Sequence, residues 1–79
     1  MSARLVFLGR LEDEAGGAER AVAAGPFTAI IAGLEPALVA ALSEPFIRMA
    51  VNGVLVADPG AVVLADGDEL AFLPPVSGG

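Results

Sequence analysis

The residues of this chain best suited to chemistry are the last six, Pro74-Pro75-Val76-Ser77-Gly78-Gly79. Each proline fixes φ and removes a backbone donor, so a hydrogen-bonded strand cannot continue through the pair. The two glycines lack a Cβ atom and can therefore enter a narrow channel in almost any backbone conformation. Such a segment presents one group for reaction, the terminal carboxylate of Gly79, which becomes an electrophile only after activation. We expect residues 1–73 to form a single domain and residues 74–79 an extended, flexible tail.

The rest of the composition argues against side-chain catalysis. The chain contains no His, Cys, Lys, Tyr or Trp, which leaves its hydroxyl groups without a base to activate them. The absence of cysteine also excludes disulfides and thiolate metal ligands, and we expect no metal site. By itself, the chain is expected to be non-catalytic.

The charge and hydropathy of the chain limit its partners. Ten acidic residues and four arginines give a net charge of −6, which argues against nucleic-acid binding and favours a partner with a basic docking surface. No apolar run reaches the roughly 20 residues of a membrane span. The first residues lead directly into a strand-like run without the features of a secretory signal. We therefore expect a cytoplasmic protein that binds neither nucleic acid nor membrane.

Apolar patterns predict the elements of the N-terminal half. Residues 4–8 form a strand-like run typical of a strand covered on both faces, residues 9–17 a charged loop, and residues 18–24 a second strand paired as a hairpin. Apolar side chains then recur at the spacing of one helical face, namely Phe27, Ile30, Ile31 and Leu34. Pro36 is placed to begin a second helical segment, which ends before Pro45.

The C-terminal half predicts a hairpin and a final strand. The hairpin lies within residues 47–56 around Asn52-Gly53, a dipeptide that favours a type I′ turn. Residues 62–64 are compatible with a brief strand or with a helical turn. Asp66-Gly67-Asp68 then turns the chain into a last strand, residues 69–73. A single helical layer on one face of a mixed sheet would bury these apolar residues, which predicts an α+β fold.

Residues 64–79 closely resemble the C-terminus of the small, sulfur-carrying subunit of molybdopterin synthase, a ubiquitin-like β-grasp protein. The resemblance lies in an Asp-Gly-Asp turn, an apolar strand, two prolines and a terminal Gly-Gly. It implies that the first and last strands lie side by side at the centre of the sheet, with one face packed on the predicted helix. The other face would leave an apolar patch, where we expect Phe7, Phe72 and Leu73 to contact a partner. A shift of one residue in register would exchange the two faces.

The resemblance also implies a carrier function. A ubiquitin-activating-enzyme-like adenylyltransferase would use ATP to adenylate Gly79, and a sulfur donor protein would convert the adenylate to a thiocarboxylate. The carrier would then insert residues 74–79 into the large synthase subunit, which supplies the catalytic side chains within a heterotetramer. No cofactor would bind the carrier itself. The absence of cysteine would leave one position for the transferable sulfur.

Three other functions are compatible with these features. Sulfur carriers for thiamine synthesis or tRNA thiolation share the fold and the Gly-Gly end, although the Pro-Pro-Val-Ser lead-in resembles the molybdopterin branch. A protein tag would be joined through Gly79 to lysines of other proteins, although this chain has no lysine on which chains could be built. The third alternative is a β-grasp interaction module with an inert tail, because Gly- and Ser-rich ends are common at domain termini.

Overall fold

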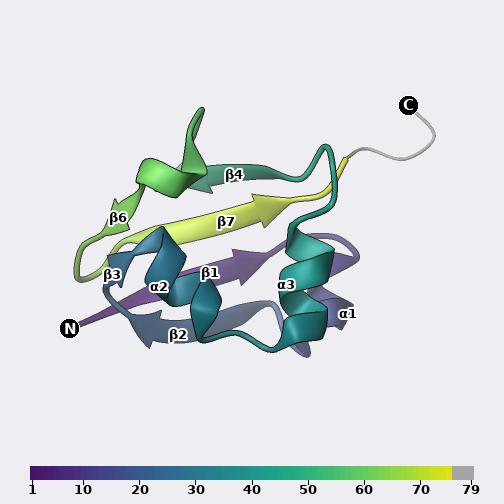
Figure 1. Ribbon diagram of the computed structural model, residues 1–79, viewed down its shortest axis with the longest axis horizontal. Coiled ribbons are helices and arrows are strands. Elements are labelled where there is room, and N and C mark those ends of the chain that lie inside the picture. The colour runs from purple at the N-terminus through teal and green to yellow at the C-terminus, as the bar shows by residue number, and fades with distance from the viewer. Residues whose placement is uncertain (76–79) are drawn as a thin grey trace.

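The two strands at the centre of the sheet come from opposite ends of the domain. In the computed structural model, which describes residues 1–75, β1 (Ser2–Phe7) pairs in parallel with β7 (Glu69–Leu73). Their register places Phe7 beside Phe72. This central parallel pair confirms the arrangement implied by the resemblance (Figure 1).

The described residues form a sheet of five strands in the order β2-β1-β7-β4-β5 and a small ladder of β3 with β6. The remaining strands are β2 (Glu19–Ala23), β3 (Gly25–Pro26), β4 (Arg48–Val51), β5 (Val54–Leu55) and β6 (Val63–Leu64). The helices are α1 (Leu11–Ala15), α2 (Phe27–Ala32), α3 (Pro36–Leu42) and the 3-10 helix η1 (Pro59–Ala61). The predictions for residues 76–79 lie outside the described part of the chain.

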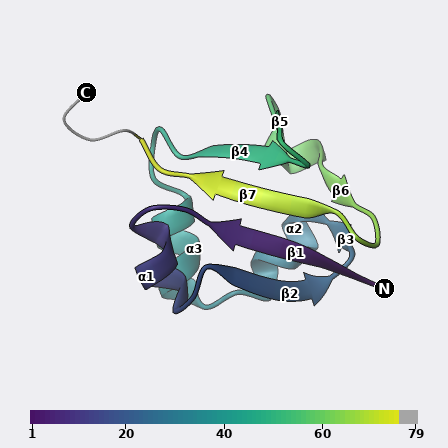
Figure 2. The same ribbon diagram turned by 180° about the vertical axis from the view of Figure 1, so that it is seen from behind.

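The helices cover one face of the sheet (Figures 1 and 2). On this inner face the alternate residues of the central strands are buried, namely Ala3, Leu5, Phe7, Leu70 and Phe72. The rings of Phe7 and Phe72 stack with their centroids 5.5 Å apart and their planes 7° from parallel. Ile30 of α2 is buried in the same cluster, and Phe27 and Ile31 pack against it half-buried, as the helical spacing predicted. The α+β fold with a helical layer on one face is confirmed.

The segment predicted as a charged loop contains a short helix, so the prediction for residues 9–17 is wrong over α1. Leu11 is completely buried, and α1 packs against α3. Gly16 ends the helix with a left-handed φ of 78°. Because one buried residue produces no helical periodicity, the sequence pattern did not indicate this helix.

Of residues 62–64, which the sequence left open between a brief strand and a helical turn, Val63 and Leu64 form the strand β6. The 3-10 helix η1 comes first, and β6 follows it and pairs antiparallel with β3. The backbone N–H of Phe27 donates to the carbonyl of Val62 over 2.8 Å. This contact joins the start of α2 to the segment between η1 and β6.

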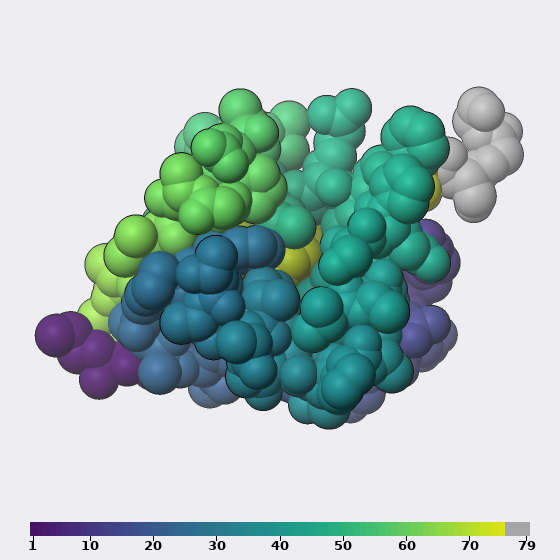
Figure 3. All heavy atoms as spheres, in the orientation of Figure 1, coloured from purple at the N-terminus to yellow at the C-terminus, as the bar shows by residue number. Residues whose placement is uncertain are grey.

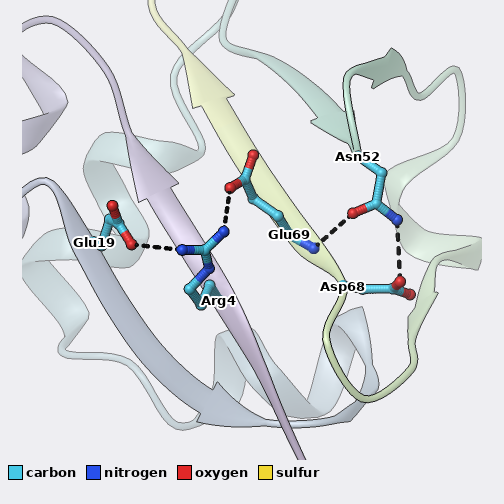
Figure 4. A network of polar contacts seen from close by, with 5 residues as sticks. All are labelled: Arg4, Glu19, Asn52, Asp68 and Glu69. Carbon is cyan, nitrogen blue, oxygen red and sulfur yellow. Dashed lines mark hydrogen bonds and ion pairs between the residues drawn. The ribbon is translucent and has the colours of Figure 1, made fainter.

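The turn of the β4–β5 hairpin also holds the start of β7. Asn52 and Gly53 have φ angles of 50° and 85°, as a type I′ turn requires, and the predicted hairpin is confirmed. The side-chain amide of Asn52 donates to Asp68, and its carbonyl accepts the backbone N–H of Glu69, each over 3.0 Å (Figure 4). Asp68 also accepts the backbone N–H of Ala65 over 2.8 Å. These contacts fix the turn from which β7 begins.

Asp68 should make the stability of the fold depend on pH in the acidic range. The N–H of Ala65 and then the amide of Asn52 lower the pKa of this carboxyl group below its ordinary value. A lowered folded-state pKa stabilises the fold above the unfolded pKa, and this contribution is lost as the pH falls through the folded pKa. We expect Asp68→Asn to lower the melting temperature by a few degrees at neutral pH.

Thermal melts of the native chain and the Asp68→Asn variant across a pH series measure this contribution. The difference between them should shrink as the pH falls below the ordinary aspartate pKa of about 3.9. A difference that stays constant into strong acid would contradict the assignment, because the lost stability would then not depend on the charge of Asp68.

Candidate functional site

The candidate site is the rim of the sheet where β7 ends. β7 ends at Leu73, and Pro74 and Pro75 follow without a backbone N–H to continue the ladder. On the β1 side, the N–H of Leu8 donates to the carbonyl of Phe72 over 3.2 Å. The chain therefore leaves the sheet where its two central strands end (Figure 2).

Gly9 sets how closely the first proline approaches β1. Its φ of 56° lies in the left-handed region, which L side chains rarely adopt. A Cβ atom at this position would lie 2.9 Å from Cγ of Pro74, closer than an unstrained contact allows. Sequence reasoning missed Gly9 as a site residue because the restriction comes from the other end of the chain. The local signal was a glycine directly after an apolar strand.

The structure corrects two of the three predicted partner contacts. The exposed fraction is 1% for Phe7 and 0% for Phe72, because the alternation of side chains along a strand turns both rings toward the helices. Neither ring can therefore meet a partner at the surface, and both support the rim from beneath. Leu73 points to the opposite side of the sheet and is half-buried. Of the three, Leu73 is the residue placed to contact a partner.

The outer face is the side of the sheet that the helices leave open (Figure 2). Around the end of β7 its alternate residues are apolar apart from Arg48, which is opposite Leu73. The apolar ones are Val6, Leu8, Ala50, Ala71 and Leu73. Arg4 crosses the same face between Glu19 and Glu69, with N–O distances of 3.1 and 2.7 Å (Figure 4). Such exposed ion pairs contribute little to stability. The outer face therefore combines an apolar region beside the rim with a charged group farther along β7.

Acidic side chains lie at the same end of the molecule as the rim. Glu12, Asp13 and Glu14 are exposed on α1, which follows the end of β1 (Figures 1 and 2). Nearby, Arg10 forms an ion pair with Glu44 over 2.9 Å, which links the start of α1 to the segment after α3. The acidic triplet is thus free to act on an approaching partner through its charge.

A groove of about 350 Å³ lies between β2 and α2, away from the rim. Its lining is mostly alanine and glycine, together with Arg20, which donates to Glu35 over 2.7 Å and thereby lowers the pKa of that carboxyl group. In residues 1–75 no group of three His, Cys, Asp or Glu side chains is placed to hold a metal ion. No helix in the same range is long and apolar enough to cross a bilayer. The groove presents small side chains and backbone rather than reactive groups.

The topology and the rim together define a class of protein. A mixed sheet with parallel first and last strands at its centre and helices on one face is the ubiquitin-like β-grasp fold. Residues 7–79 match the ThiS family, and since this match covers most of the chain, the protein belongs to the ThiS family of ubiquitin-like sulfur carriers. No curated protein sequence is a significant match.

Solved structures agree with this assignment. SAMP1 from Haloferax volcanii has a TM-score of 0.78 and 31% sequence identity, with 100% of both chains covered. A chain of the complex of subunits 1 and 2 of molybdopterin-converting factor from Helicobacter pylori 26695 has a TM-score of 0.67 and 26% identity, again with 100% of both chains covered. SAMP1 from Methanosarcina acetivorans shares the fold with a TM-score of 0.80 at 24% identity, covering 99% of this chain and 96% of that one.

Proposed function

We propose that this chain is the sulfur carrier of molybdenum cofactor biosynthesis and the small subunit of molybdopterin synthase. The observation that carries the proposal is the segment Pro-Pro-Val-Ser-Gly-Gly, residues 74–79, which follows the central strand β7. The 26% identity along the full chain to the Helicobacter pylori molybdopterin-converting factor complex supports the same branch of the family.

The proposed chemistry takes place at the C-terminal carboxylate of Gly79. A carboxylate oxygen attacks the α-phosphorus of ATP within a partner adenylyltransferase, and pyrophosphate leaves. A donor protein then supplies sulfur at the oxidation level of sulfide. This sulfur attacks the acyl carbon and forms the C–S bond, the bond to AMP breaks, and the thiocarboxylate remains. Two carriers in succession deliver the two dithiolene sulfurs of molybdopterin, inside the large subunit that supplies the catalytic side chains. Pro74 and Pro75 limit the conformational entropy that the tail loses on insertion.

The large subunit is proposed to dock on the apolar part of the outer face. Leu73 lies at the centre of this region, next to Leu8 on one side and Arg48 on the other. Any protein that takes up residues 74–79 must approach this rim, and an apolar patch beside it offers area to bury. The Helicobacter pylori relative is a complex of subunits 1 and 2, which supports a large-subunit partner for this chain.

The acidic triplet of α1 should accelerate docking. Reversing Glu12, Asp13 and Glu14 to lysine would replace attraction to a basic surface of the large subunit with repulsion. We expect the association rate at low salt to fall by about tenfold or more, with a smaller change in the dissociation rate. Stopped-flow association with the large subunit across a salt series measures both rates.

Asp58→Lys serves as the control, because Asp58 directly precedes η1. The helix η1 (green in Figure 1) lies at the end of the sheet opposite the rim. The Asp66–Glu69 cluster is a poorer choice, since the carboxylate of Asp68 holds the start of β7 and that of Glu69 pairs with Arg4. If the triple reversal changes neither the association rate nor its salt dependence, the acidity serves solubility alone.

The pathway is tested by supplying the thiocarboxylated chain to purified large subunit and pterin precursor. We expect conversion of the precursor to the dithiolene product at two carriers consumed per product. The unmodified chain with a Gly79 carboxylate is the control and should give no product. Sulfur delivery to a thiazole precursor or a tRNA, with none to the pterin, would contradict the molybdenum cofactor pathway.

One observation favours a second candidate function, that of a protein tag. SAMP1, named small archaeal modifier protein 1, shares 31% identity with this chain over its whole length. In a tag, a lysine amine of another protein would attack the activated carbonyl of Gly79, and AMP would leave as the isopeptide bond forms. A covalent adduct that survives denaturation and reduction would identify this function.

A further inference from the structure

The segment between α3 and β4 contains an aromatic residue in an unfavourable backbone conformation. The N–H of Ile47 donates to the carbonyl of Glu44 over 3.4 Å, which closes a turn with Pro45 and Phe46 at its two central positions. Phe46 has a φ of 72°. A turn with proline second and a positive φ third is of type II, and its third position is normally occupied by glycine or asparagine. Phe46 therefore occupies a position for which its side chain is poorly suited.

Packing does not compensate for this conformation. The exposed fraction of Phe46 is 79%, whereas the stacked Phe7 and Phe72 are completely buried. An exposed ring contributes little hydrophobic stabilisation to the domain. Residues held in unfavourable backbone regions cluster at active and binding sites. The conformation and the exposure of Phe46 together point to a role outside the folding of this chain.

Phe46 lies beside the rim from which the tail leaves. β4 pairs antiparallel with β7 so that Arg48 is opposite Leu73, and Phe46 stands two residues before Arg48, on the side where Pro74 and Pro75 continue. Figures 1 and 3 show the connection from α3 to β4 standing out from the surface next to the end of β7. It is therefore the neighbour of the tail on the β4 side.

A second exposed apolar side chain flanks the rim on its other side. Leu8 follows β1 and has an exposed fraction of 41%. Its backbone N–H donates a hydrogen bond to the carbonyl of Phe72. Because β7 lies between β1 and β4, the chain leaves the sheet between Leu8 and Phe46. A protein that encloses the tail must come into contact with both.

We propose that Phe46 anchors this chain to the large synthase subunit by inserting its ring into an apolar pocket beside the mouth of the channel that receives the tail. The inference rests on the proposed function and extends the docking region across the rim, from the outer face to the α3–β4 turn. Large aromatic side chains that fill a partner's pocket carry much of the free energy of an interface. The aromatic ring gains on binding the burial that it lacks in the free chain.

The variant Phe46→Gly separates binding from folding, because glycine is the residue that this turn position favours. We expect the melting temperature to stay unchanged or to rise, while the Kd for the large subunit weakens by about tenfold or more. Phe46→Asn, which also suits a positive φ, should behave in the same way. Val63→Ala is the matched control, since Val63 is 68% exposed on β6 and belongs to neither the rim nor the outer face. Its Kd should equal that of the native chain.

Calorimetric titration of the large subunit with each variant, together with thermal melts, provides these values. If Phe46→Gly binds the large subunit as tightly as the native chain, the anchor is overturned and the carrier function stands. If Phe46→Gly instead raises only the KM of the adenylyltransferase, the proposed partner is wrong. If the native chain itself fails to bind the large subunit, the anchor and the proposed function are both overturned.

Discussion

Removing Gly78 and Gly79 is expected to abolish sulfur loading and to leave the melting temperature unchanged. The core is complete at Phe72, and every buried residue of the described chain lies within or before β7. The proposed chemistry requires a carboxylate that reaches the reactive centre of the adenylyltransferase. A chain that ends at Ser77 presents its carboxylate two residues too early and beside a side chain. The loss of loading should therefore be complete.

Intact mass spectrometry after incubation with ATP, adenylyltransferase and sulfur donor measures the loading, and thermal melts measure the stability. Ser77→Ala is the control, because it keeps the length of the tail and the end at Gly79. A marked fall in melting temperature on deletion would show that the tail belongs to the folded structure. Continued loading of the shortened chain would place the reactive carboxylate elsewhere.

Truncation of Phe72 to alanine should remove a large part of the stability of the domain. The ring is completely buried and stacked on Phe7 at 5.5 Å, so its removal leaves a cavity between the central strands and the helices. Such truncations cost about 3–5 kcal/mol, against a total stability of about 5–15 kcal/mol for a domain. For a chain of this length the melting temperature should fall by roughly 12–40 °C.

Phe27→Ala provides the comparison for Phe72→Ala. The helical spacing placed Phe27 in the core, and it packs there, but it is half-buried at the start of α2. Because less apolar surface is lost and solvent can fill part of the space, its truncation should destabilise the domain less than that of Phe72. Chemical denaturation of both variants measures the two free energies. An equal or greater loss for Phe27→Ala would contradict the placement of the core between β1, β7 and the helices.

The elements with strong local signals were predictable from the sequence. Asn52-Gly53 identified the β4–β5 hairpin, and the spacing of Phe27, Ile30 and Ile31 identified α2. The parallel pairing of β1 with β7 followed from the resemblance, because apolar runs do not specify which strands pair. The sequence did not predict which alternate side chains of the two central strands face the helices. Both central strands are apolar at successive positions, so Phe72 and Leu73 were equally suited to either side, and the packing of the helices decides between them.

Two features of the rim depend on contacts that a local pattern does not contain. Gly9 must be small because Pro74 packs against it, and the two are brought together only by the parallel pairing of β1 with β7. Phe46 has a backbone conformation opposed to its residue preference, so propensity predicts the wrong turn for it. Both lie next to the tail. At Phe46, local preference and the observed structure disagree beside the rim on which the partner is proposed to dock.

The central claim is that the C-terminal carboxylate of Gly79 carries transferable sulfur, and one measurement tests it directly. The purified chain is incubated with ATP, adenylyltransferase and sulfur donor, and its intact mass is then determined. We predict a gain equal to the replacement of one oxygen atom by sulfur, confined to the C-terminal peptide and absent without ATP. An unchanged mass under conditions in which ATP is consumed, or a gain on any other peptide, would contradict the account.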